Sequence, residues 1–173
     1  MDLMRIAKHL LLADRQLRRA FPAAVLTQIE QAVRRAESLH AGQICFVVEG
    51  GLDPQSLWRG QLARERAIEV FSQLRIWDTE HNNGVLAYVL LADRAVEIIV
   101  DRGIHAKAEA GVWEEICRAM EYAFRRGQYA EGVQAGVQAV AAQLGRCFPM
   151  SAPGLNELPD RPLRLERQAR RGQ

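Results

Sequence analysis

The stretch from residue 77 to residue 103 constrains the fold of this chain more than any other. Asn82-Asn83-Gly84 is a turn signal, and the apolar run of residues 85–91 follows it directly. Asp93-Arg94 separates this run from a second apolar run at residues 96–100. Two such runs joined by so short a connection predict a β-hairpin.

The two loops at the open end of this hairpin should lie side by side, because antiparallel strands place the start of one beside the end of the other. Both loops are rich in side chains that can bind a ligand. We therefore expect the polar site of the protein there, formed by Asp78, Glu80, His81, Asn82, Asn83, Asp101, Arg102 and His105.

A third strand is predicted earlier in the chain. Residues 43–49 form a continuous apolar run, which is typical of a central strand covered on both faces. Apolar spacing predicts one helix over about 57–76 as the crossover to the hairpin. Such crossovers are right-handed and join parallel strands, so residues 44–49 and 85–91 should be parallel neighbours. Residues 96–100 then pair antiparallel with the second of these strands.

Helical spacing also predicts helices over about 22–40, 109–126 and 128–146. Gly132 and Gly136 lie four residues apart in the last of them. Their small face predicts close packing on the sheet or on a neighbouring helix. His9 and His40 fall on or at the end of helices, where we expect them at the surface.

Composition and charge indicate one globular domain with basic ends. The chain has 173 residues, of which 49% are hydrophobic and 25% are charged, enough for one core of ordinary size. We divide it into a basic amphipathic helix (1–20), an α/β domain (21–148) and a flexible basic tail (149–173). The middle part holds 13 basic and 16 acidic side chains, whereas nucleic-acid binding needs a basic face. We therefore expect no nucleic-acid partner.

Cysteine usage and the N-terminal residues predict a cytoplasmic protein. Cys45, Cys117 and Cys147 lie far apart and form no Cys-x-x-Cys pair, which suits a reducing compartment. The apolar residues 10–13 run directly into Asp14-Arg15, so we assign no signal peptide. No window approaches the ~18 apolar residues of a spanning helix.

Residues 1–20 predict a helix with one apolar and one basic face. Leu3, Ile6, Leu10 and Leu17 recur at helical spacing, and Lys8 with several arginines occupies the other face. Such a helix either covers the domain with its leucines or docks on an anionic membrane surface. The tail carries five arginines and is a second electrostatic candidate. Electrostatic docking through this helix or through the tail would place the protein peripherally at the inner face of a membrane.

Several of these pieces, in this order, resemble the TPM domain family. The resemblance covers roughly residues 22–145 and rests on Asn83-Gly84-Val85-Leu86, Asp93-Arg94, Gly103, Ala110-Gly111, Phe124-Arg125-Arg126-Gly127-Gln128-Tyr129 and Gly132-Val133-Gln134-Ala135-Gly136. It implies a three-layer α/β/α domain with a small mixed sheet. For studied members it implies calcium binding in the loops, and for a plant member weak acid phosphatase activity. Many relatives are exported or membrane-anchored, so a bacterial-type cytoplasmic member departs from the commoner arrangement.

Calcium needs several oxygen ligands that converge from loops, and Asp78, Asn83 and Asp101 carry the right atoms. The loop pattern of the family is altered here, however. Lys107 stands near the place of an acidic residue of the family, and the usual Gly-aromatic-Gly loop reads Asp101-Arg102-Gly103. A lysine repels a cation, so we expect a degenerate site in which calcium is not an assured cofactor.

Two catalytic alternatives remain. His81, Asp101 and His105 could form a transition-metal or acid–base cluster, although no His-x-x-His pair supports it. Phosphatase chemistry would be metal-assisted or would use Asp101, Arg102 and His105, with the arginine orienting phosphate. The chain has no Gly-x-Ser-x-Gly elbow and no Walker loop, and Cys45 is expected to be buried.

The leading interpretation is therefore a TPM-domain binding or accessory protein that meets a protein partner, at or near a membrane. The alternative is a weak metal-dependent acid phosphatase, and a third possibility is a structural subunit of a membrane-linked complex.

Overall fold

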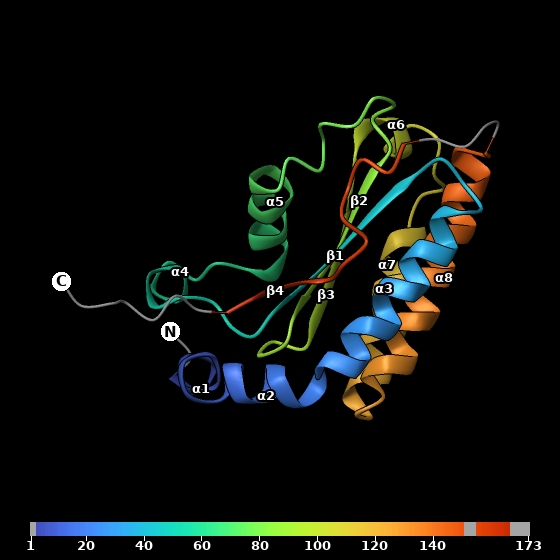
Figure 1. Cartoon of the computed structure of the whole chain (residues 1–173). Coiled ribbons are helices and arrows are strands. Elements are labelled where there is room, and N and C mark those ends of the chain that lie inside the picture. The colour runs from blue at the N-terminus through green and yellow to red at the C-terminus, as the bar shows by residue number, and fades with distance from the viewer. Residues whose placement is uncertain (1–2, 151–154, 167–173) are drawn as a thin grey trace.

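A computed structural model describes residues 3–150 and 155–166. Its centre is a mixed sheet in the order β3-β2-β1-β4 (Figure 1). The strands are β1 (Gln43–Glu49), β2 (Gly84–Leu90), β3 (Ala95–Val100) and β4 (Leu163–Leu165). The helical elements are α1 (Leu3–Ala7), a π-helical turn η1 (Lys8–Leu12), α2 (Ala13–Ala20), α3 (Ala23–Glu37), α4 (Pro54–Trp58), α5 (Ala63–Gln73), α6 (Arg102–His105), α7 (Val112–Arg125) and α8 (Tyr129–Cys147).

The predicted strand pairing is confirmed. β1 and β2 are parallel, with Ile44 opposite Val85, and β2 and β3 are antiparallel, with Val85 opposite Val100. Residues 91–94 connect β2 to β3, and Arg94 adopts a positive φ of 53° in this turn. The strand ends differ from the predicted ones by a single residue.

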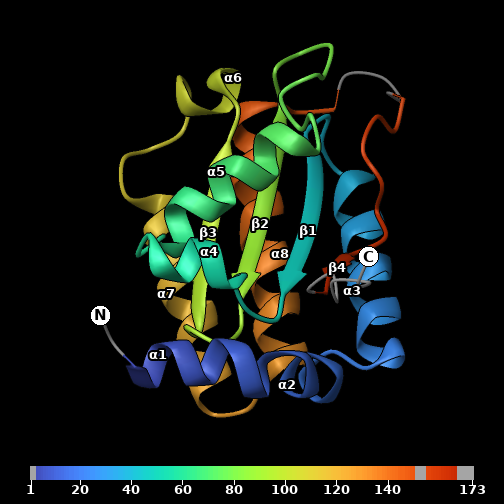
Figure 2. The same cartoon turned by 90° about the vertical axis from the view of Figure 1, so that its left-hand side faces the viewer.

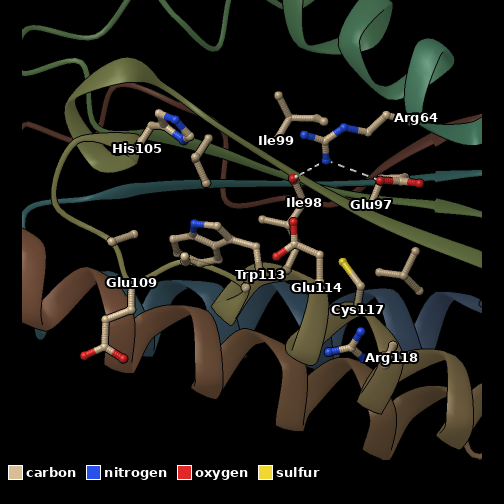
Figure 3. Close-up of a pocket in the computed structure, with 15 residues that line it drawn as sticks. Arg64, Glu97, Ile98, Ile99, His105, Glu109, Trp113, Glu114, Cys117 and Arg118 are labelled. Atoms are coloured by element: carbon tan, nitrogen blue, oxygen red, sulfur yellow. Dashed lines mark hydrogen bonds and ion pairs between the residues drawn. The ribbon is translucent and has the colours of Figure 1, made fainter.

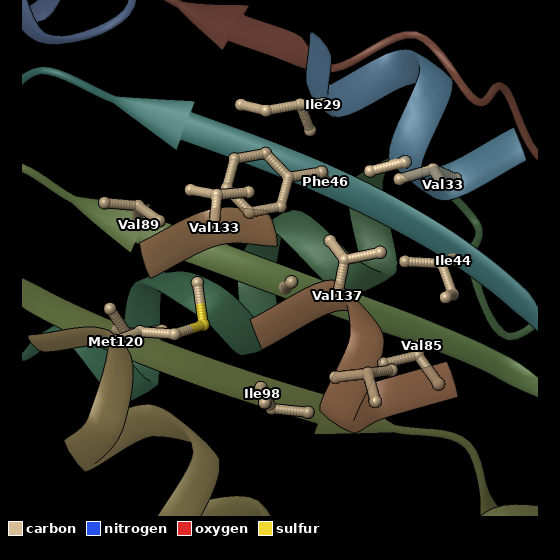
Figure 4. Close-up of a cluster of buried hydrophobic side chains, with 14 of the residues drawn as sticks. Ile29, Val33, Ile44, Phe46, Val85, Val89, Ile98, Met120, Val133 and Val137 are labelled. Atoms are coloured by element: carbon tan, nitrogen blue, oxygen red, sulfur yellow. The ribbon is translucent and has the colours of Figure 1, made fainter. Parts of the chain in front are cut away.

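The sheet is covered on both faces, as the expected three-layer architecture requires. α3, α7 and α8 pack on one face, and α4 and α5 lie on the other (Figure 1). Phe46, Val89 and Ile98 of the sheet face the layer of α3, α7 and α8, and they share a buried cluster with Val133 of α8 (Figure 4). Every residue of β1 and β2 is buried. This explains their continuous apolar runs, because neither face of these central strands meets water.

The crossover differs from the single helix predicted over 57–76. It consists of α4 and α5, and the chain between them turns at Gly60 with a φ of 71°. A residue with a left-handed backbone conformation ends a helix. Apolar spacing does not reveal such a residue, so it predicted one continuous helix where the structure has two. The chain becomes helical again at α5, where the Glu65 carboxylate accepts a hydrogen bond from the Leu62 N–H group at 3.0 Å.

The close packing predicted for the small face of α8 is confirmed. A Cβ atom at Gly132 would lie 2.8 Å from the Cβ atom of Ala123, and one at Gly136 would overlap the sulfur of Met120. Both neighbours belong to α7. The two glycines therefore allow α7 and α8 to approach closely.

The N-terminal helix, which comprises α1, η1 and α2, lies across the end of the sheet at which β1 and β2 end (Figure 2). Leu17 is fully buried, and Ile6 and Leu10 pack against the core on the α5 side of the sheet. Arg5 also donates a hydrogen bond to the Gln61 carbonyl at 2.7 Å. The apolar face of this helix therefore covers the domain.

His9 fixes the helix in place, and the expectation of a surface histidine is wrong for both His9 and His40. Their exposed fractions are 0% and 1%. The Leu52 N–H group donates to His9 Nδ1 at 3.0 Å, so Nε2 carries the proton and donates to Asp93 Oδ1 at 2.8 Å. A sequence pattern could not show this, because Leu52 and Asp93 belong to two separate loops.

The C-terminal residues differ from the flexible tail expected after residue 148. β4 pairs parallel with β1, with Val47 opposite Leu163, and Leu158 is buried. The physical reason is that β1 would otherwise present an unpaired sheet edge. Residues 151–154 and 167–173, which share the predicted tail, lie outside the described part of the chain.

Candidate functional site

The two loops of the predicted polar site meet at the open end of the hairpin. The Asp101 N–H group donates to the Gly84 carbonyl at 3.0 Å, and Arg102 Nε donates to Asn82 Oδ1 at 2.9 Å. A Cβ atom at Gly103 would lie 2.6 Å from the Asn82 carbonyl oxygen. Glycine at this position therefore lets the two loops touch.

Asn83 and Asp101 are the buried members of this group, with exposed fractions of 1% and 7%. Asn83 Nδ2 donates to the Ala41 carbonyl at 2.6 Å, and Asp101 Oδ1 accepts the Arg102 N–H group at the start of α6. Asn83 Oδ1 and Asp101 Oδ2 are buried and have no hydrogen-bond partner in residues 3–150 and 155–166. These two buried oxygens are the loop atoms that have no partner within the described residues.

The other acidic loop residues are engaged elsewhere or face solvent. The exposed Asp78 forms an ion pair with Arg75 at 2.8 Å. Glu80 and His81 are exposed, and the Glu80 N–H group donates to the Glu157 carboxylate at 3.0 Å. Of the three expected metal ligands, the structure thus buries Asn83 and Asp101 and leaves Asp78 at the surface.

His105 lies in a separate groove of about 610 Å³ along the edge of β3. Figure 3 shows His105 and Trp113 toward one end of this groove and Arg64 toward the other. Side chains cover the outward-facing main chain of β3, since Arg64 Nη1 donates to the Ile98 carbonyl at 3.1 Å and Glu121 accepts the Val96 N–H group. The edge is therefore protected against strand pairing.

The donor set fits calcium poorly. Calcium takes six to eight oxygen ligands, whereas the buried loop side chains leave one amide oxygen and one carboxylate oxygen free. Within the described residues, no three histidine, cysteine, aspartate or glutamate side chains are grouped so that they could hold a metal ion.

Lys107, which was expected to repel a cation from the loops, has a structural partner. Its Nζ atom donates to the Cys147 carbonyl at 3.0 Å and lies 3.9 Å from the centre of the Phe148 ring. The ammonium group therefore neutralises the negative end of α8. This interaction explains a lysine at the position without reference to a ligand.

The thiols of Cys45 and Cys117 are unsuited to nucleophilic attack. Burial raises the pKa of Cys45 to about 12, and the nearby Glu37 adds to the shift. Burial also raises the pKa of Cys117 to about 12, with a contribution from Glu97. Only the thiolate is a good nucleophile, so neither group is activated near neutral pH.

Sequence reasoning missed two polar clusters. One joins Arg5, His9 and Asp93 beneath the N-terminal helix. In the other, Arg34 of α3 pairs with Asp160 of the C-terminal segment at 3.0 Å, and Glu37 lines the same pocket. The paired residues are distant in the chain and share no spacing motif, so no sequence signal could have found either cluster.

In residues 3–150 and 155–166, no helix is both long enough and apolar enough to cross a bilayer.

Comparisons with known proteins identify the family. The family model of the TPM domain matches residues 17–143. The NMR structure of the BA42 protein from the psychrophilic bacterium Bizionia argentinensis is similar, with a TM-score of 0.70, 27% identity, and coverage of 82% of this chain and 93% of BA42. The N-terminal domain of a P. gingivalis protein shares the fold, with a TM-score of 0.54, 23% identity, and coverage of 71% and 76%. None of the curated proteins matches this chain. Because the family model spans well over half of the sequence, the chain belongs to the TPM domain family.

Proposed function

We propose that this TPM domain is a binding or accessory module that associates peripherally with an anionic membrane surface through its N-terminal helix. The observation that carries the proposal is the outward face of α1, η1 and α2. Lys8, Arg15, Arg18 and Arg19 are exposed on it. Leu11 lies between these cations with 78% of its surface exposed.

Further apolar side chains are exposed on α1 and in the segment between α4 and α5. Met4 is 72% exposed on α1. Trp58 at the end of α4 is 74% exposed, and Leu62 is 60% exposed next to Gln61, whose carbonyl accepts the Arg5 hydrogen bond. Basic side chains combined with exposed leucine, methionine and tryptophan suit the boundary between headgroups and acyl chains.

The inner face of the helix favours docking of the folded domain over insertion of a released helix. His9 and Leu17 are fully buried, and the Arg5 and His9 bonds to Asp93 hold this face on the domain. Release would expose the Leu17 side chain and break the partly buried cluster of Arg5, His9 and Asp93. The outward face is therefore presented as a rigid surface.

The expected binding is weak and reversible. Each basic residue near an anionic membrane contributes about 1 kcal/mol, and salt screens this attraction. Four such residues are exposed here, and a few apolar side chains add to them. The described residues provide no comparable argument for the alternative, a metal-dependent acid phosphatase.

Co-sedimentation with vesicles tests the proposal. The full chain should bind vesicles with 30% phosphatidylglycerol at low salt and should dissociate from them at 0.5 M salt. It should not bind vesicles of pure phosphatidylcholine. A variant with glutamine at positions 8, 15, 18 and 19 should lose this binding. A matched variant with glutamine at the exposed Arg75, Arg118, Arg125 and Arg126 changes the net charge equally and should retain it. Equal binding by both variants would contradict the proposal.

A further inference from the structure

The outer side of the helical layer carries two apolar grooves, one on each side of α8. No described helix or strand covers this side (Figure 1). The groove between α3 and α8 measures about 570 Å³, and the groove between α7 and α8 measures about 680 Å³. Between them, Ala135, Gln138 and Ala142 of α8 are exposed, and the sequence has no charged residue from 132 to 145. The centre of a protein contact surface is depleted of charge in the same way.

The two grooves carry charges of opposite sign. Among the described residues, Arg35 is the only charged one that lines the groove beside α3. The charged residues that line the groove beside α7 are Glu115 and Glu131. Arg35 and Glu115 are both exposed. The outer face is therefore basic along one side of α8 and acidic along the other.

Glu115 stands beside the second half of α8. α7 and α8 are antiparallel neighbours joined by a short turn, and Met120 lies against Gly136. Glu115 comes five residues before Met120, and at about 1.5 Å per residue this places it level with about residue 141 of α8. The acidic side chain thus lies beside Ala142, which lines both grooves.

Arg35 stands at nearly the same level on the other side of α8. α3 and α8 end at the same end of the layer, because the Ala41 N–H group donates to the Phe148 carbonyl at 3.0 Å. Arg35 and Ala142 precede the two bonded residues by equal numbers of positions. Arg35 also lines its groove together with Ala142. One turn of α8 is therefore flanked by a cation and an anion.

We propose that a second copy of this chain covers this face, with a two-fold axis that runs along α8. Rotation about such an axis lays the α3 side of each copy over the α7 side of the other. Arg35 of each copy then meets Glu115 of the partner subunit, so the face is complementary to itself. An axis perpendicular to α8 would bring arginine to arginine and glutamate to glutamate, which is unfavourable.

The exposed residues of α8 suit this parallel arrangement. Ala135, Gln138 and Ala142 follow one another at intervals of three and four residues, the spacing of the contact line between two parallel helices. Small alanine side chains let the two helices approach closely. Glu131 lies about 16 Å from Ala142 along α8, so a modest crossing angle keeps it apart from its copy.

The arrangement also places both N-terminal helices at one end of the dimer. Phe21, directly after α2, contacts Tyr129 at the start of α8, with 5.6 Å between the ring centroids. An axis along α8 therefore leaves the two basic outward faces on the same side. The dimer does not depend on membrane docking, but a dimer that docks would use two faces at once, which strengthens a weak attachment.

Sedimentation equilibrium of the full chain without vesicles tests the proposal. At concentrations up to 500 µM, the mass should rise from 19.5 kDa toward twice that value. Arg35→Glu and Glu115→Arg should each raise the dissociation constant at least tenfold, because each sets like charges against each other. The double variant should restore the wild-type constant to within about threefold, since the reversed charges pair again. Arg118→Glu and Glu114→Arg, which reverse exposed charges elsewhere on α7, should leave it unchanged.

Oxidative cross-linking tests the orientation of the two copies. Ala142→Cys places a thiol beside its own copy across the axis, within reach of a disulfide, and should yield a covalent dimer. Ser72→Cys, exposed on α5 at the opposite face, should remain monomeric on a denaturing gel, as should the wild type.

A monomeric mass at 500 µM would overturn the proposal, as would a dimer that Arg35→Glu leaves intact. Failure of the double variant to restore the dimer would exclude the Arg35–Glu115 contact, and absence of a covalent Ala142→Cys dimer would exclude the parallel arrangement. A protein that is monomeric and still binds anionic vesicles would overturn the dimer alone. A dimer that does not bind vesicles would contradict only the membrane proposal.

Discussion

Asp93 in the turn between β2 and β3 is bonded to His9 in the π-helical turn of the N-terminal helix, with 2.8 Å between Asp93 Oδ1 and His9 Nε2. Arg5 binds the same carboxylate through Nε and Nη2 at 2.9 to 3.2 Å. The N-terminal helix is thereby attached to the sheet through one aspartate.

We predict that Asp93→Asn destabilises the protein by about 2 kcal/mol, because it removes the charge from hydrogen bonds that link the helix to the domain. Urea unfolding measures this. Asp78→Asn is the matched control, since its ion pair with Arg75 is exposed and should contribute at most about 1 kcal/mol. Similar effects of the two substitutions would contradict the attachment role of Asp93.

The Asp93 carboxylate should also stabilise the fold against acid. Burial alone would raise its pKa, but the bonds from His9 and Arg5 outweigh burial and lower the pKa to about 2. A group with a lowered pKa in the folded state stabilises above its unfolded pKa, here 3.8, and that contribution fades as pH falls toward 2. Thermal melting from pH 6 to pH 2.5 should show a smaller acid-induced drop in Tm for Asp93→Asn than for the wild type.

Glu37 should produce the opposite pH dependence. Its pKa rises on folding from 4.5 to about 8. Its contribution to the free energy of unfolding is therefore complete below pH 4.5 and is lost as pH rises through 8. The wild-type Tm should therefore fall between pH 5 and pH 8.5 by more than that of Glu37→Gln. Parallel Tm curves for the two proteins would show that Glu37 titrates normally.

Packing between α7 and α8 gives a stability prediction with an internal control. Gly136→Ala should destabilise by about 1–3 kcal/mol, because the new methyl group overlaps the Met120 side chain. Gly145→Ala lies on the same helix with open space around the new methyl group, and should stabilise by about 0.5–1 kcal/mol. Chemical denaturation of both variants tests this, and equal shifts would refute the close contact.

Calcium at 1 mM should leave the Tm unchanged. Asp101 provides the only buried, unpaired carboxylate oxygen in the described loop site, and one such charge gives weak binding. Melting with calcium, with magnesium and with a chelator decides the matter. A rise of several degrees with calcium that the chelator reverses, and that Asp101→Asn abolishes, would instead show a functional cation site.

Patterns within short stretches of sequence predicted most of the sheet. The apolar runs around Ile44, Val85 and Ile98, together with the turn at Asp93-Arg94, yielded the strands, their order and their directions. These features are local, because a covered strand must be apolar at every position and a tight hairpin needs particular turn residues. The convergence of Asn82 with Arg102 followed from the same hairpin.

Tertiary structure alone decided what the polar residues do. Nothing in the sequence distinguishes Asp93, which holds the N-terminal helix, from Asp78, which forms an exposed ion pair. His9 is buried because Leu52 and Asp93 happen to present a donor and an acceptor on either side of it. The pairing of Arg34 with Asp160 likewise depends on where the C-terminal residues 155–165 meet α3. Ionisation and hydrogen bonding respond to neighbours within a few ångströms in space, and the chain order does not specify those neighbours until the molecule has folded.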